Sequence, residues 1–145
     1  MLANYIDERY IRTNVSCKSW QDAIRAGASL LLQEACIEPR YIEAIIRHHM
    51  ELPYMVIAPG IMLAHARSEE GARAVGISII TLAEPIVFGS ELNDPVKLVI
   101  TLATTDGKKH MKLLSSLMEF LMKEELVRRL MAAKEVAEAV SIIKS

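Results

Sequence analysis

The stretch PYMVIAPGIMLAHARS, residues 53–68, consists of two short apolar runs, a turn between them and a histidine after the second. The first run, Met55-Val56-Ile57, is short and rich in β-branched side chains, which favours a strand. Pro59-Gly60 is a pair typical of turns. The second run, residues 61–64, ends directly before His65. The stretch therefore predicts two short strands joined by a turn, with a histidine at the end of the second strand.

Two helices are predicted upstream of this stretch. Ser19 is followed three residues later by Asp22, a pattern in which side chains bond the free N–H groups of a first helical turn. Apolar residues then recur at helical spacing over residues 20–35. Pro39 suits the first position of a second helix, because its missing N–H has no partner to lose there. We expect that helix to end before Pro53.

Further strands are predicted on both sides of the helices and the central stretch. Residues 10–15 suggest a short strand near the N-terminus. Residues 75–82 have the β-branched content of a buried strand, which we expect Pro85 to end. Residues 86–89 then resemble another strand or a sheet edge, and residues 96–103 form the clearest strand pattern of all.

The last third of the chain is predicted to be helical. Apolar residues at helical spacing mark one face over residues 110–121, a short helix over 126–130 and a terminal helix over 136–143. The order is two helices, a group of strands and then more helices. It predicts an α/β fold in which residues 1–145 form a single-domain sandwich, a mixed β-sheet flanked by helices.

Composition narrows the function classes. The 145 residues are 52% hydrophobic and 24% charged, so the chain can bury a full core, and the formal net charge is −1. Nucleic-acid binding usually needs an excess of positive charge, so no nucleic-acid partner is expected. No apolar stretch approaches the ~20 residues of a membrane span, and the N-terminus lacks an apolar signal core. The two cysteines, Cys17 and Cys36, form no disulfide framework, so we expect a reduced, cytoplasmic protein.

His65 is the strongest candidate for chemistry. It follows an apolar strand, and Ser68 can begin a brief helical turn that we expect to extend to Ala74. Such a strand end is where α/β proteins place reactive groups. Free backbone N–H groups and the Arg67 guanidinium could bind an anion beside the imidazole. This arrangement suits phosphoryl capture by a ring nitrogen. The alternative, a surface histidine beside a turn, remains open.

The other histidines have structural alternatives. His110 begins an apolar helical face, and it could equally be a partly buried histidine with satisfied hydrogen bonds. His49 continues the apolar stripe of the second helix while His48 lies one position around. Both could simply interact with the helix C-terminal dipole. Their spacing does not match compact zinc motifs, so no metal is expected. The absence of glycine-rich phosphate and dinucleotide motifs predicts no cofactor.

A longer set of residues carries a family resemblance. The run Pro-Tyr-x-Val-Ile-Ala-Pro-Gly-Ile leads to His65, and Phe88-Gly89 and His110 follow in the expected order. Here the sequence resembles the enzyme IIA domains of the bacterial phosphoenolpyruvate-dependent sugar phosphotransferase system, of the fructose/mannitol class and closest to the ascorbate branch. The matching segments cover nearly the whole chain and include residues 19–24, 41–46, 53–61, 64–67, 88–89 and 93–99.

The resemblance implies roles for particular histidines. In that family the histidine of a Pro-His motif carries the phosphoryl group, and the matching residue is His65. The second histidine of the family, which helps to hold the phosphorylated imidazole, matches His110. Ala64 replaces the proline that usually precedes the first histidine, so we expect a less rigid turn.

An arginine of the mannitol-type domains falls near the end of the second helix, where this chain has His48 and His49. We assign its place to His49, because His49 lies on the inward stripe. A histidine is a cation only when protonated, so we expect phosphoryl stabilisation to depend on pH.

The resemblance also implies a phosphotransferase relay with defined partners. The phosphoryl group would come from the phosphocarrier HPr and pass to a cysteine of enzyme IIB, which serves the membrane transporter enzyme IIC. The transported compound would be ascorbate or a related sugar acid or pentitol. Met62 and residues 83–92 are candidates for a shallow apolar partner surface, and a homodimer is left open. The alternative is a regulatory module that senses phosphorylation, as in nitrogen control, without serving a transporter.

Overall fold

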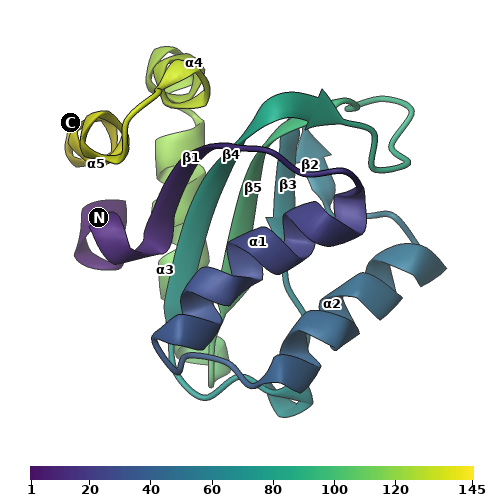
Figure 1. Cartoon of the computed structure of the whole chain (residues 1–145). Helices are drawn as coiled ribbons and strands as arrows, with labels where there is room; N and C mark the ends of the chain where they lie inside the picture. The colour runs from purple at the N-terminus through teal and green to yellow at the C-terminus, as the bar shows by residue number, and fades with distance from the viewer.

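A five-stranded mixed sheet lies at the centre of the computed structural model, which describes all residues, 1–145 (Figure 1). The strand order is β1-β4-β5-β3-β2, with β1 parallel to β4, β3 parallel to β5, and the pairs β4–β5 and β2–β3 antiparallel. The expected α/β sandwich with a mixed sheet is confirmed. The strands are β1 (Ile11–Val15), β2 (Val56–Ala58), β3 (Ile61–Ala64), β4 (Gly76–Ile86) and β5 (Val96–Ala103).

Helices cover both faces of the sheet. Figure 1 shows α1 and α2 on the near face and α3 behind the sheet, with α5 beside the N-terminal segment and α4 next to α5. The helices are α1 (Trp20–Gln33), α2 (Pro39–Glu51), α3 (Gly107–Leu121), α4 (Glu124–Ala132) and α5 (Val136–Lys144), with short 3₁₀ helices η1 (Leu2–Asn4), η2 (Glu8–Tyr10) and η3 (Ser68–Glu70). None of these helices is long and apolar enough to span a bilayer.

Two hydrophobic cores explain the continuous apolar strands. In β3, Met62 and Ala64 pack in the core under α1 and α2, whereas Ile61 and Leu63 pack in the core under α3. Alternate residues of a strand point to opposite faces, so a strand covered on both faces needs apolar residues at every position. Met62 is 0% exposed, so the expectation that it belongs to a partner surface is wrong.

The helix starts lie where the capping residues predict them. The Ser19 side chain accepts a hydrogen bond from the Asp22 backbone N–H at 3.2 Å, and α1 begins at Trp20. Pro39 is the first residue of α2. Asp106 accepts a hydrogen bond from the Lys109 N–H at 2.7 Å and caps α3. The helices α1, α2 and α3, which cover the two cores, therefore begin at residues determined by the local sequence.

Pro85 does not end β4, contrary to expectation. The strand continues to Ile86, which pairs with Val96 of β5 across a register shift. On its other side, β4 is paired with β1 only as far as Leu82. Beyond that point β4 has a free edge, where a residue without an N–H is tolerated. The expected separate strand at 86–89 is thus partly the end of β4.

The carboxyl ends of β3 and β5 lie at one edge of the sheet, because these strands are parallel and Ala64 is in register with Thr101. The following segments therefore meet there. The helical turn expected to reach Ala74 is only the 3₁₀ helix η3, since Gly71 adopts a φ of +132° and ends it. A Cβ at Gly71 would lie 3.0 Å from the Tyr41 Cβ, so this turn requires glycine.

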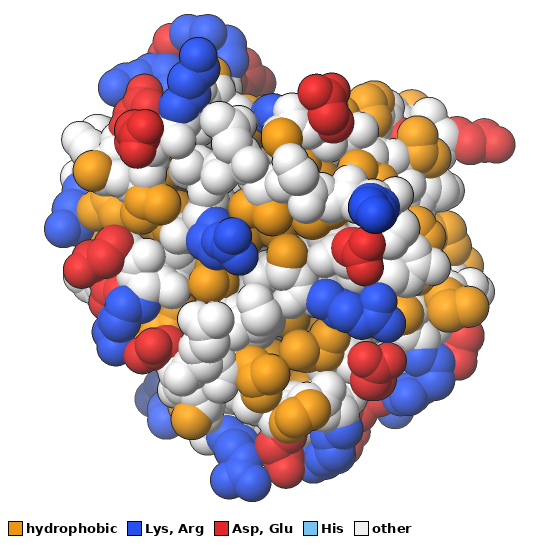
Figure 2. Space-filling model, viewed as in Figure 1, with side chains coloured by type: hydrophobic (Ala, Val, Ile, Leu, Met, Phe, Trp, Pro, Cys, Tyr) orange, Lys and Arg blue, Asp and Glu red, His pale blue; other side chains and the backbone are white.

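The face covered by α1 and α2 shows acidic and basic side chains interspersed, as Figure 2 shows. This pattern agrees with the balanced charge of the sequence, 17 basic against 18 acidic residues. Such a face has no strong single-sign field with which to attract a charged partner.

Candidate functional site

His65 lies immediately after β3 at this edge of the sheet, and its ring orientation is set by the backbone. The Nδ1 atom lies 2.9 Å from the carbonyl oxygen of Leu63. A carbonyl oxygen can only accept, so Nδ1 carries the proton and donates it. In the neutral ring the lone pair is then on Nε2, the nitrogen that can act as a nucleophile or accept a proton.

A hollow of about 160 Å³ borders the His65 ring. Its other lining residues are His48 at the end of α2, Tyr54 before β2, and Ala66 and Arg67 after the histidine. The Tyr54 ring meets the His65 ring edge to face, with centroids 6.0 Å apart. Tyr54 is 51% exposed, so one wall of this hollow lies at the protein surface.

A second hollow, of about 280 Å³, brings His110 to the same segment. Ala66 and Arg67 line both hollows, so the two hollows adjoin each other. The His110 Nδ1 atom lies 3.1 Å from the Thr104 hydroxyl oxygen. Because His110 is in the first turn of α3, the positive end of the helix dipole faces the second hollow. The structure thus places His65 and His110 at two adjoining hollows.

The Arg67 guanidinium is exposed and forms no ion pair within the chain, whereas its backbone is fixed. The Arg67 N–H donates to the Glu70 carboxylate at 2.9 Å. A free guanidinium beside two imidazoles suits a bound phosphoryl group or another oxyanion.

Glu70 joins the end of α2 to the segment after His65. Its carboxylate lies 2.8 Å from the Arg47 guanidinium and 2.8 Å from the His48 Nε2 atom. Burial alone would raise the pKa of Glu70, but the Arg67 N–H, the His48 ring and the Arg47 charge together hold this pKa below its ordinary value. Glu70 is thus an anion that positions His48 at the His65 hollow.

Tyr41 is a site residue that no motif in the sequence indicated. Its hydroxyl donates to the Leu102 carbonyl oxygen at 2.7 Å and accepts from the Ala66 N–H at 3.0 Å. Tyr41 is 1% exposed, and its burial raises its pKa to about 12, so the hydroxyl stays neutral. It ties the residue after His65 to the end of β5. The only signal in the sequence was a polar aromatic residue within an otherwise aliphatic buried stripe.

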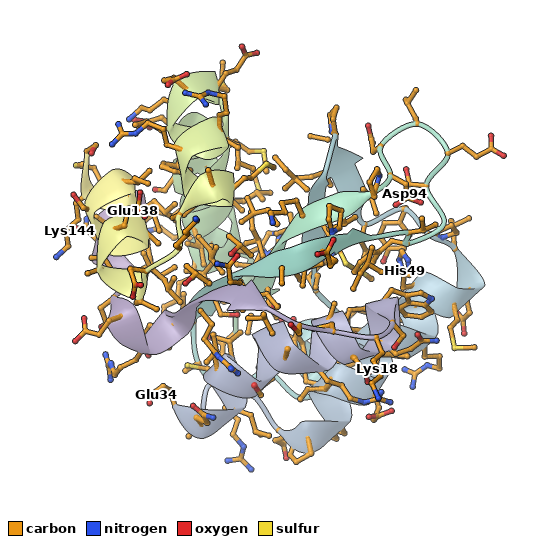
Figure 3. All side chains as sticks on the ribbon, turned by 45° about the horizontal axis from the view of Figure 1, so that its top comes forward. Lys18, Glu34, His49, Asp94, Glu138 and Lys144 are labelled. Carbon is orange, nitrogen blue, oxygen red and sulfur yellow. The ribbon has the colours of Figure 1, made fainter.

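His49 lies apart from this group, although we expected it to border the site. It lines neither hollow and is 2% exposed. Its Nε2 atom donates to the Phe88 carbonyl oxygen at 2.6 Å, and its ring packs on Trp20 with centroids 4.8 Å apart. Figure 3 labels His49 near the loop that contains Asp94. The inward stripe of α2 points to the core rather than to the site, which is why His48 is the histidine at the hollow.

The loop beside His49 has its own scaffold. The Asp94 carboxylate accepts hydrogen bonds from the N–H groups of Phe88, Gly89 and Ser90 at 2.8–2.9 Å. Val87 and Leu92 in the same segment are 67% and 89% exposed. The segment 83–92 therefore presents apolar side chains to solvent, unlike Met62. Nowhere does the chain bring together three or more His, Cys, Asp or Glu residues that could hold a metal ion.

Comparisons with known proteins agree on one family. The family model for the phosphoenolpyruvate-dependent sugar phosphotransferase system, EIIA 2, matches residues 4–145. The ascorbate-specific PTS system EIIA component of Shigella dysenteriae serotype 1 is 36% identical over 135 residues, which cover 92% of this chain and 88% of that protein.

Two solved structures have the same fold. The mannitol-specific cryptic phosphotransferase enzyme IIA CmtB of Escherichia coli has a TM-score of 0.90 and 34% identity, covering 98% of this chain and 97% of that one. The complex of enzyme IIAMTL with phosphorylated enzyme IIBMTL from Escherichia coli contains a chain with a TM-score of 0.83 and 22% identity, with 96% of each chain covered. At that identity, the second likeness shows the fold alone.

Proposed function

The chain belongs to the EIIA 2 family of the phosphoenolpyruvate-dependent sugar phosphotransferase system, and on this premise we propose that His65 carries the phosphoryl group between HPr and enzyme IIB. Family membership makes the chain a phosphoryl carrier of a sugar phosphotransferase system. The residue that is modified, the donor, the acceptor and the sugar are the content of the proposal.

The observation that carries the proposal is the fixed tautomer of His65. Because Nδ1 donates to Leu63, the Nε2 lone pair is available at the hollow shared with His48, Tyr54 and Arg67. Nε2 attacks the phosphorus of phosphorylated HPr, an N–P bond to His65 forms, and the electron pair of the broken N–P bond returns to the HPr imidazole. The proton stays bonded to Nδ1 throughout, and Nδ1 continues to donate its hydrogen bond to the Leu63 carbonyl oxygen.

The second transfer reverses the role of His65. A cysteine thiolate of enzyme IIB attacks the phosphorus, an S–P bond forms and the N–P electron pair returns to Nε2. The three phosphoryl oxygens carry most of the charge in such a transfer, so positioned cations and donors provide the catalysis. We assign this task to the Arg67 guanidinium, to His110 from the adjoining hollow, and to His48 held by Glu70.

The surface beside His65 suits two successive protein partners. Met50 lies in the last turn of α2, and Leu52 and Tyr54 follow it before β2; these side chains are 68%, 63% and 51% exposed. Exposed apolar side chains beside a reactive group mark a protein interface more often than a small-molecule cleft. The solved complex of a similar fold contains phosphorylated enzyme IIB, which supports enzyme IIB as one partner.

The sugar is proposed from the relatives. Ascorbate-specific EIIA components are 34–36% identical to this chain, so we assign ascorbate or a related sugar acid or pentitol, with enzyme IIC as the membrane component served from the cytoplasm. The relatives named above bear sugar-specific names, which favours this assignment over the regulatory alternative.

The relay can be rebuilt from purified parts. With labelled phosphoenolpyruvate, enzyme I and HPr, the wild-type chain should become labelled and pass the label to an ascorbate-type enzyme IIB faster than to a mannitol-type one. His65→Gln should accept no label while keeping its circular dichroism spectrum. Label on folded His65→Gln would overturn the assignment of His65. Labelling of the wild type without transfer to either enzyme IIB would favour the regulatory alternative.

A further inference from the structure

The largest hollow of the molecule lies away from His65. It has a volume of about 790 Å³ and is bounded by the N-terminal segment, the loop before β4 and the first half of α3. None of its lining residues borders the hollows of His65 or His110. The polar residues that line it are Asn4, Tyr5, Asp7, Arg9, Tyr10, Arg73, Thr105, Lys109, Lys112 and Lys144.

The charge in this hollow departs from the balance of the chain. Five cationic side chains and one carboxylate line it, although the whole chain has a net charge of −1. The one carboxylate belongs to Asp7. Its oxygens accept hydrogen bonds from the Arg9 guanidinium at 2.8 and 3.0 Å, and these bonds lower the pKa of Asp7. Lys112 and Lys144 form no ion pair with any carboxylate of the chain. The charge of Lys144 also helps to lower the pKa of Asp7, but the lining of the hollow still has more cationic side chains than carboxylates.

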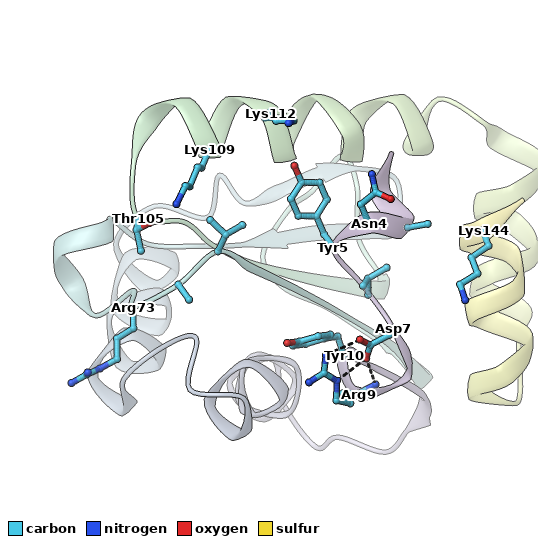
Figure 4. A pocket seen from close by; sticks show the side chains of 14 residues that line it. Asn4, Tyr5, Asp7, Arg9, Tyr10, Arg73, Thr105, Lys109, Lys112 and Lys144 are labelled. Atoms are coloured by element: carbon cyan, nitrogen blue, oxygen red, sulfur yellow. Dashed lines mark hydrogen bonds and ion pairs between the residues drawn. The ribbon is translucent and has the colours of Figure 1, made fainter.

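The lining of the hollow also includes aromatic rings and a guanidinium that is held in place by hydrogen bonds. The Arg9 guanidinium is held by Asp7 and, at 2.8 Å, by Glu34, and it lies 5.1 Å from the centre of the Tyr10 ring. Figure 4 shows Arg9 and Tyr10 on one side of the hollow, Tyr5 and Lys109 on the other, and Lys144 at one end. Aromatic faces and hydroxyl groups on opposite walls suit the body of a small polar molecule.

We propose that this hollow binds the phosphomonoester of a small polar metabolite. The phosphate would lie between the lysines, and the polar body would pack between the two tyrosines. A phosphomonoester carries close to two negative charges at pH 7, which complements two lysines without partners. The volume lies within the range of small-molecule sites. Sugar phosphates and nucleoside monophosphates share this chemistry, and the proposal stands independently of the relay through His65.

Titration of the isotope-labelled chain tests the proposal. Glucose 6-phosphate, adenosine monophosphate, inorganic phosphate and glucose are added separately, and backbone amide shifts and calorimetric heats are recorded. We expect at least one phosphomonoester to bind more tightly than inorganic phosphate, with shifts at Tyr5, Thr105 and Lys109. Which of the two binds better decides between a sugar phosphate and a nucleotide, and glucose should not bind.

Variants localise the binding. The double variant with Lys112→Gln and Lys144→Gln should lower the affinity for the tighter-binding phosphomonoester by about tenfold or more, because two charge-assisted contacts are lost. The matched control is Lys108→Gln, an exposed lysine of the same helix that does not line the hollow and should change affinity less than twofold. All these variants should still accept phosphoryl groups from HPr.

Three results would overturn the proposal. The first is no binding of either phosphomonoester at millimolar concentration. The second is inorganic phosphate binding as tightly as both. The third is a set of shifts confined to Ala66, Arg67 and His110, which would assign the anion to the site described above.

Discussion

The Tyr41 hydroxyl oxygen lies 3.0 Å from the backbone nitrogen of Ala66, the residue that follows His65. The same hydroxyl donates to the Leu102 carbonyl oxygen at the end of β5. One buried side chain of α2 thus joins the two parallel strands whose ends carry the candidate site. We expected the turn to be less rigid because Ala64 stands where the family usually has proline, and Tyr41 provides a tether two residues later, at Ala66.

Tyr41→Phe removes this tether while keeping the ring. It leaves the Ala66 N–H and the Leu102 carbonyl oxygen without this partner, so we expect the free energy of unfolding to fall by about 1–3 kcal/mol. Urea unfolding measures the change, and transfer from HPr should slow in the folded variant. Tyr5→Phe, at a partly exposed ring, is the control and should change stability by less than about 0.5 kcal/mol. Equal effects of the two substitutions would contradict the role of Tyr41.

Glu70→Gln removes the carboxylate that Arg47 and His48 share. The folded-state pKa of Glu70 is lowered, so its ionised form stabilises the fold above pH ~4.5, and this contribution is lost as the pH falls through the lowered pKa. We therefore expect the variant to be less stable than the wild type at pH 6 and to lose less stability on acidification below ~4.5. Unfolding curves at several pH values measure this. Glu69→Gln, one residue away and exposed, should follow the wild-type curve.

His48→Ala removes the ring that Glu70 holds at the His65 hollow. We assign His48 to binding the phosphoryl oxygens, so we expect transfer from HPr to slow by about tenfold or more in this variant. His48→Arg, which puts a permanent cation in the same place, should restore part of the rate. His49→Phe should transfer at the wild-type rate, because His49 lines neither hollow. Single-turnover kinetics measures these rates, and an unchanged rate in His48→Ala, or an equal loss in His49→Phe, would count against His48.

His110→Ala should leave the fold largely intact, because His110 is only partly buried and contacts the Thr104 hydroxyl. It removes the donor that we propose for the phosphoryl oxygens, so we expect transfer to slow by about tenfold or more. Rapid-quench kinetics with phosphorylated HPr measures the rate. Thr104→Val, which removes only the partner of His110, should cause a smaller loss. An unchanged rate in His110→Ala would exclude it from the site.

Much of the fold is readable in the sequence because its signals are local. Ser19, Pro39 and the β-branched run of β5 each determine an element through their own conformational preferences. Pro85 misled the prediction because its tolerance depends on where β1 stops pairing with β4, which is a long-range property.

The candidate site was predictable only in part. His65, Arg67 and His110 follow from a strand end, a helix start and the family resemblance. The helical periodicity of α2 correctly placed His49 on its buried face. Burial in the core is different from proximity to the site, however. His48 borders the hollow because of the path that the chain takes after His65. The Tyr41 contacts with Ala66 and Leu102 span 25 and 61 residues, beyond the reach of local pattern.

The central claim is that the phosphoryl group is carried by a particular nitrogen atom. The direct measurement is a long-range proton–nitrogen correlation spectrum of the imidazole rings, recorded on the nitrogen-15-labelled chain before and after phosphorylation by enzyme I and HPr. Our account predicts a phosphorus coupling at Nε2 of His65, with Nδ1 still protonated and bonded to Leu63. A phosphorylated Nδ1, or a phosphoryl group on any other residue, would contradict it.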